Sequence, residues 1–549
     1  MGTGQWPKRD GPSRLVVSYD LTVSREPGRE PGIVSAYLAS TPPADVDTGA
    51  LAYYASLDRI AMQAPSIAAS IIRELHSQRS NIKLIASENY SSLPSQLAHG
   101  NLFIDKYAEG YPGHRFYAGC ENVDAIESEA VGLARELFGA EHAYVQPHAG
   151  ADANIVAFLA ILGVTVEAPM LAELGLTSPV KVPAEEWATI RSELNSRRLL
   201  AMDFYSGGHL THGYRFNFSS RLFDTATYTV DPDTKLLDMA SLRRRAKEVE
   251  PHILLGGYSA YTRKINFAQM REIADEVGAV LMVDMAHFAG LVAGKVFTGD
   301  FDPVAHAHVV TSTTHKTLRG PRGGIVLCRE EFAQAVDKGC PTVLGGPLPQ
   351  AIAAKAVSFR EALQPEFRQY ADRIVKNARL LAEELQRRGV QVLTGGTDNH
   401  IVLADVASSF GLTGMQAETV LRSCGLTLNR NALPFDEMGP WYTSGLRLGS
   451  AAITTLDFTD DEIIEIADIL KSVLSETQPA TATAADSSPK RVKGEYEVLR
   501  GVVVTAKARV ADLLARHPVY PELDLELIAS TPLGSEALGE SVPTLSGVV

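Results

Sequence analysis

The sequence feature that most constrains the fold is a pair of buried apolar segments, each of which ends abruptly in ionisable residues. The first, Ala279-Val280-Leu281-Met282-Val283, is followed by Asp284-Met285-Ala286-His287. The second ends at His308-Val309-Val310 and leads into the stretch Thr311–Gly324, which contains Lys316. We interpret both as buried strands of an α/β sheet. Because ligands in such open sheets bind at the carboxyl ends of the strands, we expect Asp284 and Lys316 to face one pocket.

Lys316 is an unusual residue for a plain loop, because it stands between small hydroxyl residues and the run Gly320-Pro321-Arg322-Gly323-Gly324. An ammonium group placed there must be paired, desolvated or used covalently. A lysine that loses its proton in a partly dry pocket can attack a carbonyl and form a Schiff base. A carboxylate such as Asp284 can keep a pyridine nitrogen protonated, as pyridoxal phosphate chemistry requires. For Lys316 taken alone, a solvated turn lysine is the alternative.

The stretches Thr311–Gly324 and Asp284-Met285-Ala286-His287 resemble those of serine hydroxymethyltransferase, a pyridoxal phosphate enzyme of the aspartate-aminotransferase-like fold. The resemblance runs from about Ile60 to Leu474. It implies fold type I, in which an α/β large domain with a mostly parallel seven-stranded sheet flanked by helices precedes a smaller C-terminal α+β domain. The implied reaction is the reversible transfer of the serine hydroxymethyl group to tetrahydrofolate, which gives glycine and 5,10-methylenetetrahydrofolate through a pyridoxal phosphate aldimine and quinonoid.

The resemblance also implies a role for individual residues. The catalytic residues would be Lys316, Glu109, Asp284, His209 and Tyr117. Cofactor contacts would come from Lys316, Asp284, His287, His209, Ala149, Gly150, Ala151, Ser259, Thr313, His315, Tyr107, Gly345 and Gly346. Substrate would be bound by Ser87, Tyr117, Arg447, Arg322 and Glu109, and the co-substrate tetrahydrofolate by Glu109, Phe116, Phe204, Gly208, Leu210 and Asn431. The residues alone support only a Schiff-base lysine with an acid, histidines and an arginine that binds a carboxylate.

Two segments depart from the family pattern. Ala149 and Ala151 stand where the family usually carries serines, so two hydroxyl donors to the phosphate are lost. Asp152 replaces an uncharged residue and would repel phosphate, so we expect its side chain to face away. We expect Ser259, together with Thr314 or His315, to compensate. Phe116 stands where a tyrosine is usual, so one hydrogen bond near the folate or the substrate would be missing.

Changes in composition along the chain place the expected domain boundaries. Residues 1–50 are expected to form a poorly ordered N-terminal extension and 51–105 an N-terminal arm. Residues 106–349 would form the large cofactor-binding domain, with an insertion at about 164–198, and 350–476 the small C-terminal domain. Gln478–Ser488 lacks large apolar residues, which predicts a linker, so 477–549 is expected to be a linker and tail with one helix.

Composition bounds the function classes. The 549 residues are 45% hydrophobic with a net charge of −14, which argues against a nucleic-acid or anionic-membrane surface. We expect no membrane-spanning helix, on the ground that no apolar run reaches the required length. Four scattered cysteines, without a CxxC pair, favour a reducing, cytoplasmic setting. The resemblance implies a homodimer or a dimer of dimers with shared active sites.

Three other functions remain open at this point. A folate-independent aldolase, transaldolase or racemase could use the same scaffold, and Phe116 and the altered phosphate segment keep that alternative open. A metal-dependent hydrolase could use the residues Asp284, His287, His306, His308 and His315. A non-catalytic relative that binds the cofactor is the third alternative, and the intact lysine, acid and arginine argue against it.

Overall fold

The computed structural model describes residues 32–483 and 489–539, and the chain divides there into two compact units. The larger unit runs from Glu74 to Leu523 and contains the sheet with its ionisable strand ends. The smaller unit combines the residues up to Arg73 with those from Asp524 onward. Helices dominate the smaller unit, in which α1 (Ile33–Ser40), α2 (Thr48–Ala61), α24 (Leu525–Ala529) and α25 (Pro532–Gly539) occur.

The larger unit is built around a seven-stranded sheet in the order β4-β10-β9-β8-β7-β5-β6. These strands span His142–Tyr144, Gly324–Cys328, Val309–Thr313, Val280–Asp284, Ile253–Gly257, Arg198–Met202 and Asp224–Tyr228, respectively. The five strands from β9 to β6 are mutually parallel, and β10 runs antiparallel to both β9 and β4. The mostly parallel seven-stranded sheet expected from the sequence is therefore confirmed.

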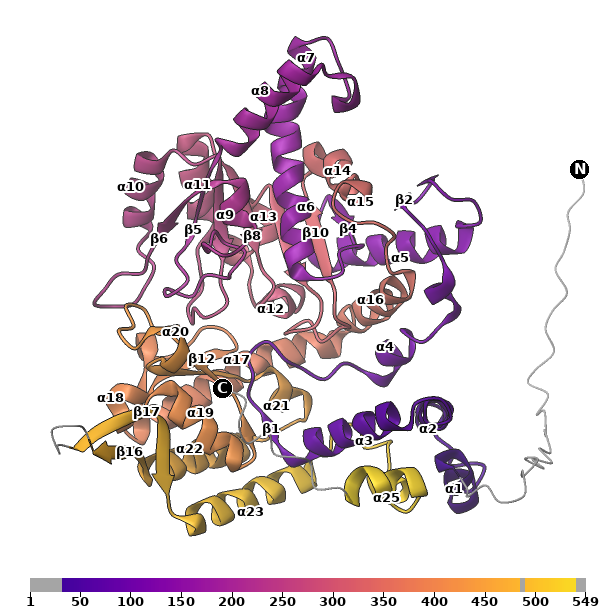
Figure 1. Cartoon of the computed structure of the whole chain (residues 1–549), viewed down its shortest axis with the longest axis vertical. Coiled ribbons are helices and arrows are strands. Elements are labelled where there is room, and N and C mark those ends of the chain that lie inside the picture. Colours follow the sequence, from indigo (N-terminus) through magenta and orange to yellow (C-terminus); the bar gives the residue numbers. More distant parts are fainter. Residues whose placement is uncertain (1–31, 484–488, 540–549) are drawn as a thin grey trace, which may run out of the picture. The chain divides into compact units, whose positions relative to one another are not determined.

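Helices cover both faces of this sheet (Figure 1). One face packs against α5 (Glu121–Phe138), α10 (Met239–Val249) and α11 (Phe267–Val277), and its buried core includes Leu254, Leu281 and Val310. The other face packs against α6 (Gly150–Leu162), and alternate strand residues such as Leu255 and Met282 lie in that second core. Because successive strand residues point to opposite faces, strands buried on both sides must be apolar throughout, as the sequence of β8 is.

One helix in this region reaches the length of a membrane span. The helix α6 continues through a π-helical turn (Gly163–Glu167) into α7 (Ala168–Glu173), which makes 24 helical residues, and 44% of its most apolar window is buried. The expectation that no apolar run is this long is therefore wrong. Buried α6 residues such as Phe158 and Ile161 pack against the sheet, and this packing accounts for the apolar sequence.

The region expected to be an insertion is mainly helical. After α7 come a short 3-10 helix (Pro179–Lys181) and α8 (Ala184–Asn195), and the latter matches the helix predicted at Ala184–Leu194. Figure 1 shows α7 and α8 at the top of the view, beyond the end of the sheet. Val180 is 89% exposed, whereas Leu171 of α7 and Ile190 of α8 are buried, so only part of this segment lies outside the core.

The C-terminal part of the larger unit has a four-stranded sheet in the order β11-β12-β15-β14. These strands span Gln391–Val392, Ile401–Asp405, Gly445–Gly449 and Asn429–Asn431. The helices α16 (Pro349–Ala362) and α17 (Pro365–Arg387) lead into it, and α19 (Gly414–Ser423) and α22 (Asp460–Ser475) share its core. The arm that follows α3 (Pro65–Ser80) joins this part, because β1 (Ile82–Lys83) pairs with β13 (Leu426–Thr427).

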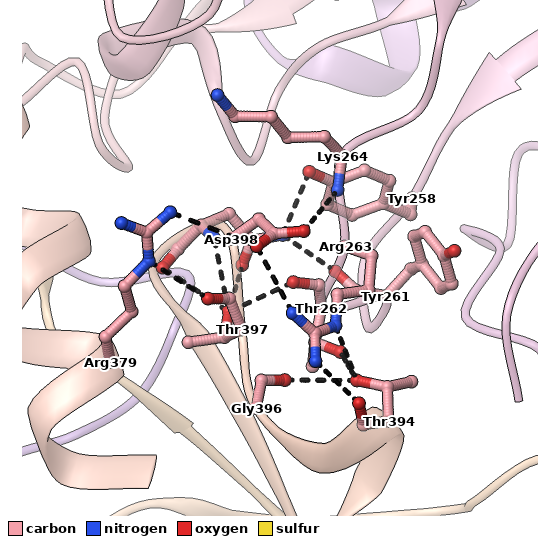
Figure 2. Close-up of polar contacts among 11 residues, drawn as sticks. Tyr258, Tyr261, Thr262, Arg263, Lys264, Arg379, Thr394, Gly396, Thr397 and Asp398 are labelled. Carbon is pink, nitrogen blue, oxygen red and sulfur yellow. Dashed lines mark hydrogen bonds and ion pairs between the residues drawn. The ribbon is translucent and has the colours of Figure 1, made fainter. Parts of the chain in front are cut away.

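The seven-stranded and the four-stranded sheets are joined by a cluster of polar contacts (Figure 2). Arg263, which lies after β7, donates to the Thr394 hydroxyl at 3.1 Å and carbonyl at 2.6 Å, and pairs with Asp398 at 3.2 Å. Asn399 Nδ2 donates to the Tyr258 hydroxyl and to the Tyr261 carbonyl, both at 3.0 Å. The segment after β7 and the segment before β12 are thereby held at one relative position.

Both ends of the chain differ from expectation within the described residues. Helix α1 and the start of α2 fall inside the extension expected to be poorly ordered, while residues 1–31 of that extension lie outside the described residues. The expected linker is also wrong. Its first residues belong to β16 (Thr477–Thr483), which pairs with β17 (Pro489–Val498), and residues 484–488 lie outside the described part.

The β16–β17 hairpin is held by hydrogen bonds to its backbone and by two apolar side chains. The Thr413 hydroxyl, just before α19, and the Gln416 amide of α19 donate to the carbonyls of Lys493 and Glu495. Tyr496 and Val498 of β17 pack against the core of the C-terminal part. Three helices follow the hairpin, namely α23 (Arg500–Arg516), α24 and α25, where only one was expected.

The remaining helices and strands are short connecting elements. They are α4 (Leu93–Leu97), β2 (Gly110–Tyr111), β3 (His114–Arg115), α9 (Ser219–Leu222), α12 (Ala289–Ala293), α13 (Pro303–His306), α14 (Glu330–Asp337), α15 (Gly339–Thr342), α18 (Val406–Phe410), α20 (Gly439–Tyr442) and α21 (Ala451–Thr455), with 3-10 turns at Leu102–Asp105, Gly299–Phe301 and Leu393–Gly395.

Candidate active site

The strand register sets the position of the site. Gly257 of β7 pairs with Asp284 of β8, and Asp284 pairs with Thr311 of β9, so three adjacent strands end at nearly the same level. Lys316 follows β9 directly at this carboxyl edge. His308 lies at the amino end of the same strand, where its Nδ1 accepts a hydrogen bond from Leu281 N at 2.9 Å. A metal site that combines His308 with His315 is therefore ruled out by the length of the strand.

The amine of Lys316 lies in a mostly desolvated position. Its Nζ donates to the Thr313 hydroxyl at 2.9 Å, and the Thr313 hydroxyl in turn donates to the Ala286 carbonyl at 3.2 Å. Burial lowers the pKa of Lys316 to about 8, although the Asp284 carboxylate acts in the opposite direction. A substantial fraction of this amine is neutral near pH 8, as a nucleophilic lysine requires.

Asp284 is buried and accepts several hydrogen bonds. Its Oδ2 lies 3.0 Å from Asn154 Nδ2 and 3.2 Å from His212 Nε2, and its Oδ1 accepts from Ala286 N at 3.0 Å. Burial alone would raise the pKa of Asp284, but the His212 and Asn154 hydrogen bonds outweigh it and hold the pKa well below its usual range. The carboxylate therefore stays ionised at neutral pH.

Sequence reasoning missed both side chains that donate to Asp284. Asn154 is a buried amide between apolar residues of helix α6, and that polar residue is the signal that could have identified it. His212 stands three residues after His209.

His209 is half-buried at the carboxyl edge, where its Nδ1 lies 2.8 Å from the Thr211 hydroxyl. Burial lowers the pKa of His209 to about 4, so its imidazole is neutral at pH 7. One ligand atom each from His209, His212 and Asp284 lies within 4.8 Å of the others. Tetrahedral zinc with bonds of about 2.1 Å would need these atoms about 3.4 Å apart. The Asp284 carboxylate is engaged by Asn154 and His212, and His209 Nδ1 lies against the Thr211 hydroxyl.

Arg447 lies on β15 and reaches across to the large domain. Its Nε donates to Asn429 Oδ1 at 3.1 Å and its Nη1 to the Ser259 carbonyl at 2.8 Å. Burial lowers the pKa of Arg447 to about 10, so the guanidinium keeps its charge at neutral pH. A buried cation held by two neutral acceptors leaves the rest of its fork for an anion. Sequence reasoning did not identify Asn429 as an orienting residue.

Lys316, His209 and Arg447 line one cavity of about 260 Å³, whereas the buried Asp284, expected to face the same pocket, is not on its wall. Ten of the residues predicted from the sequence lie on its wall: Ser87, Phe204, Gly208, His209, Leu210, Ser259, His287, Lys316, Asn431 and Arg447. Ala260 and Ala432 complete the lining. His287 is held from behind by His400, whose ring stacks on it at 5.5 Å. A nucleophilic amine and a carboxylate-binding cation in one cavity suit an amino acid substrate.

Comparisons with known proteins decide the family. A model of the serine hydroxymethyltransferase family matches residues 60–175 and 188–470. The chain belongs to the serine hydroxymethyltransferase family. A serine hydroxymethyltransferase of Treponema pallidum is 56% identical over 490 residues, which are 89% of this chain and 84% of that protein. Those of Mycolicibacterium smegmatis and Salinispora tropica are 53% and 54% identical over 87% and 86% of this chain, and over 96% and 98% of their own lengths.

Membership of this family establishes the reaction that the enzyme catalyses. The enzyme interconverts serine and glycine with tetrahydrofolate as co-substrate, and it depends on pyridoxal phosphate. The resemblance inferred from the sequence is thus confirmed in family, fold type I and activity. The metal-dependent hydrolase and the non-catalytic relative receive no support.

The comparisons also revise the limits of the resemblance. The alignment with the Treponema pallidum protein covers 490 residues, whereas the family match runs from 60 to 470, which is 411 positions. The likeness therefore extends by 79 residues past one or both ends of the family match. It was expected to stop at about Ile60 and Leu474. Within the family match only residues 176–187 are left out, which is a shorter segment than the insertion expected at 164–198.

The segment expected to hold the cofactor phosphate begins helix α6. Ala149 is the residue before its first turn, and the backbone N–H groups of Gly150 and Ala151 lie at its N-terminus, where the helix dipole favours an anion. On the lysine loop, the buried Nδ1 of His315 has no hydrogen-bond partner among the described residues. Burial lowers the pKa of His315 to about 3, so this ring is neutral. The N-terminus of a 13-residue helix and an unpartnered buried nitrogen are both features that fit a bound phosphate.

Two expectations about this segment need qualification. The Asp152 carboxylate accepts the Ala149 N–H at 3.0 Å, so it folds back on the helix start and engages one of the donors that a phosphate could use. The Thr314 hydroxyl donates to the Pro321 carbonyl at 2.5 Å and is fully buried. Thr314 therefore cannot replace the missing serine hydroxyls, which leaves Ser259 and His315.

A second group of predicted residues lies apart from the cavity wall. Tyr107 and Tyr117 contact each other edge to face at 5.0 Å, and both are largely exposed. Tyr117 is hydrogen-bonded to Glu109, whose charge raises the pKa of Tyr117. A Cβ atom added to Gly345 or Gly346 would meet Glu109 or the Tyr107 ring, so the glycine pair lies against this group. Phe116 is 69% exposed, and Arg322 is exposed at the cofactor edge.

Proposed function

We propose that the 260 Å³ cavity is the catalytic centre, in which Lys316 holds pyridoxal phosphate and Arg447 binds the carboxylate of serine or glycine. The observation that supports this assignment is that the buried amine of Lys316 and the buried guanidinium of Arg447 both lie on the wall of this cavity. When bound, the cofactor supplies an electron sink for the bond that breaks at the substrate Cα.

The surrounding residues fix that cofactor. With the cofactor bound, the ionised carboxylate of Asp284 would keep a proton on the pyridine nitrogen, and the neutral ring of His209 would lie against the pyridine. His287, Thr313, His315 and Ser259 would orient it. The N–H groups of Gly150 and Ala151 at the start of helix α6 would hold the phosphate, and that of Ala149 would join them once released by Asp152. Because Asn154 and His212 hydrogen-bond Asp284, they keep that carboxylate ionised.

Substrate recognition follows from the cation on β15. Arg447 and the hydroxyl of Ser87 bind the α-carboxylate, and the exposed Arg322 contributes charge at the edge of the site. Tetrahydrofolate occupies the part of the cavity lined by Phe204, Gly208, Leu210 and Asn431. Phe116, which has no hydroxyl, contributes only apolar surface to the folate.

We also propose that Glu109 serves the active site of a second copy of the chain. Glu109 moves the proton of the serine hydroxymethyl group, and Tyr117 hydrogen-bonds it, but neither lies on the cavity wall of its own chain. Tyr107, Gly345 and Gly346 would reach the partner's cofactor in the same way. Leu102, Ile104 and Phe116 near this group are 86%, 65% and 69% exposed, and contiguous apolar exposure of this kind is typical of a subunit interface. The assembly is then a homodimer or a dimer of dimers with shared sites.

Complementation of inactive variants tests shared sites. A Lys316→Ala protein and a Glu109→Gln protein, each inactive alone, are unfolded together and refolded as a mixture. If sites are shared, half of the dimers are hybrids with one intact site, so up to about one quarter of wild-type activity returns. If each chain uses its own Glu109, no activity returns.

A cytoplasmic location is the last part of the proposal. All four cysteines, Cys120, Cys328, Cys340 and Cys424, are free and buried, as expected of a chain that folds in a reducing compartment. Fractionation of cells that express the enzyme, with activity followed in each fraction, tests this location. Activity in a membrane or exported fraction would contradict it.

An absorbance titration tests the catalytic centre. The visible band of the bound cofactor should shift to longer wavelength when glycine and tetrahydrofolate are added together, and Lys316→Ala should abolish the covalently bound band. A band that responds to glycine but ignores tetrahydrofolate would instead indicate a folate-independent aldolase. No band after incubation with pyridoxal phosphate would show that the changed segment Ala149–Asp152 cannot hold the phosphate.

A further inference from the structure

The side chain of Lys355 is buried and is not used by the proposed catalytic centre. It lies on α16 and is 1% exposed. Its Nζ donates to three backbone carbonyl oxygens, those of Val145 at 2.6 Å, Pro147 at 2.9 Å and Gly324 at 3.0 Å. A buried ammonium is costly unless its N–H groups find acceptors, and here three N–H groups meet three carbonyls.

These carbonyls belong to two segments of the site. Val145 and Pro147 follow β4 and lead directly into the phosphate segment that starts at Ala149. Gly324 closes the loop that carries Lys316, and its own N–H donates to the Pro147 carbonyl at 2.9 Å. Lys355 therefore joins the phosphate segment and the lysine loop at the point where both leave the sheet.

The paired glycines at the end of the lysine loop fit this arrangement. A Cβ atom at Gly323 would collide with the side chain of Lys355, and one at Gly324 would collide with the carbonyl of Ala149. The sequence Gly-Pro-Arg-Gly-Gly thus lets the loop lie against the Lys355 side chain and the phosphate segment. A larger residue at either position would push these segments apart.

Gln146 lies between Val145 and Pro147, the two residues after β4 whose carbonyls Lys355 binds, and its side chain extends the contact in another direction. Its side chain is 1% exposed. Its Nε2 donates to the Gly110 carbonyl at 2.8 Å and to Glu127 Oε1 at 2.7 Å, and its Oε1 accepts from the Tyr144 hydroxyl at 2.9 Å. The amide therefore has a partner at both ends and reaches the strand that follows Glu109.

Arg115 completes the connection. Its Nη2 donates to Glu127 Oε2 at 2.5 Å, and its Nη1 donates to the carbonyls of Ala108 at 2.9 Å and Gly110 at 2.8 Å. These two carbonyls flank Glu109, whose own carbonyl accepts from Phe116 N at 3.0 Å. The carbonyls of three consecutive residues, 108 to 110, are thus fixed by hydrogen bonds. The side chains of Arg115 and Glu127 are only 4% and 2% exposed, so their ion pair is protected from water.

We propose that Lys355, Gln146, Glu127 and Arg115 form one buried positioning cluster, the Lys355 cluster, which holds the phosphate segment, the lysine loop and the Glu109 segment in fixed relation. The proposal rests on the roles assigned above to those three segments. None of the four residues touches the cavity, so each acts through the backbone that it binds.

The chemistry of Lys355 suits this role better than other side chains would. An ammonium offers three N–H donors on one atom, whereas an amide offers two and a methionine none. A guanidinium is planar and wider, and the close approach of Gly323 leaves no room for it. Replacement of Lys355 therefore leaves at least one carbonyl without a donor at the base of the site.

Cofactor affinity and amide exchange test the cluster directly. Lys355→Met should raise the dissociation constant for pyridoxal phosphate by at least about tenfold, because the carbonyls that lead into the phosphate segment lose the Lys355 donor and only Pro147 keeps the Gly324 N–H. In the cofactor-free protein, amide hydrogens of residues 147–151 and 320–324 should exchange faster. Gly323→Ala perturbs the same contact by displacing the lysine, so it should shift both measurements in the same direction even if Lys355→Met fails to fold.

Asn377→Leu is the matched control. Asn377 is also 1% exposed and donates to the Thr454 hydroxyl at 2.9 Å, away from the cavity. This variant should lower the melting temperature and leave cofactor affinity within about twofold. If it weakens cofactor binding as much as Lys355→Met does, the effect is general destabilisation and the proposal is wrong. The proposal is also wrong if Lys355→Met and Gly323→Ala leave affinity and exchange unchanged.

Gln146→Met separates the two ends of the cluster. It removes the contacts with Gly110 and Glu127 but leaves the three bonds of Lys355, so kcat should fall at least about tenfold while cofactor affinity changes less than about threefold. In the Glu109→Gln variant, Gln146→Met should lower the residual kcat little further, because the carboxylate that Gln146 helps to position is already gone. An equal fall in kcat in both backgrounds would show that Gln146 does not act through Glu109. Cofactor affinity and amide exchange are measured without serine or tetrahydrofolate, so they test the cluster even if the role of Glu109 is wrong.

Discussion

Replacement of Arg447 with lysine should weaken the binding of serine and glycine and leave the binding of pyridoxal phosphate unchanged. The guanidinium of Arg447 is buried and fixed at two points, by Asn429 Oδ1 and by the Ser259 carbonyl. A lysine at 447 would keep the charge but could not make both of these bonds and a two-point contact with a carboxylate.

The expected loss of serine affinity follows from the hydrogen bonds that the substitution removes. The ammonium retains one contact with the carboxylate and loses the second, and a hydrogen bond to a charged group contributes about 1.5–3 kcal/mol. At about 1.4 kcal/mol per factor of ten, serine should bind about 10- to 150-fold more weakly. Asn429→Leu removes only the orienting bond, which is worth about 0.5–1.5 kcal/mol, so it should weaken serine binding by about 2- to 13-fold.

A spectral titration of the bound cofactor with serine measures this affinity at equilibrium, and serinamide provides the matched ligand. Serinamide has no carboxylate, so Arg447→Lys should change its affinity by less than about twofold. The reasoning is refuted if serine affinity in Arg447→Lys stays within about twofold of wild type, or if serinamide loses as much as serine does. A large loss of cofactor affinity in the same variant would show that Arg447 supports the cofactor instead.

Three further predictions follow from the site. Incorporation of pyridoxal phosphate into the cofactor-free enzyme should speed up as pH rises through about 8. The neutral amine of Lys316 is the reacting form, and burial lowers its pKa to about 8. A pH profile of the stopped-flow rate with its midpoint about two pH units higher would refute this. Asp152→Asn should tighten cofactor binding by about fivefold, on the order of 1 kcal/mol, because it removes a negative charge from the helix start, and unchanged affinity in a fluorescence titration would show that this carboxylate does not influence the phosphate. Replacement of residues 177–183 by a short Gly-Ser linker should keep kcat/KM within about twofold, because the cavity wall contains none of them; a larger loss in the steady-state assay would assign this segment a role in catalysis.

Much of the site could be predicted from the sequence because its main groups follow directly from strand ends. Asp284 and Lys316 come immediately after apolar strands, and parallel strands in one sheet bring their carboxyl ends to one edge. Arg447 stands between apolar residues on a short strand, which indicates a buried cation in need of an anion. Ten predicted residues accordingly lie on the wall of one cavity.

The residues that hold those groups could not be predicted in the same way. Asn154 and His212 meet Asp284 across separations of 130 and 72 residues, and Asn429 meets Arg447 through the pairing of β14 with β15. Such partners depend on helix rotation and strand register, which no local pattern encodes. The hairpin β16–β17 was missed for a related reason, since several of its anchors are hydrogen bonds to main-chain carbonyls from a helix about 80 residues earlier.

The sequence by itself determined the fold class and indicated a Schiff-base lysine with an acid, because apolar periodicity and the residues at strand ends are local properties of the chain. The family followed from the resemblance of the stretches around Asp284 and Lys316 to known ones. Only the tertiary structure decided which groups are desolvated and where each hydrogen bond ends. Lys355 shows the difference most clearly. In the sequence it is one lysine in a helix, whereas in the fold its ammonium reaches carbonyls 210, 208 and 31 residues away. Burial and register arise only when distant segments pack together, and they determine the pKa values and the geometry of the site.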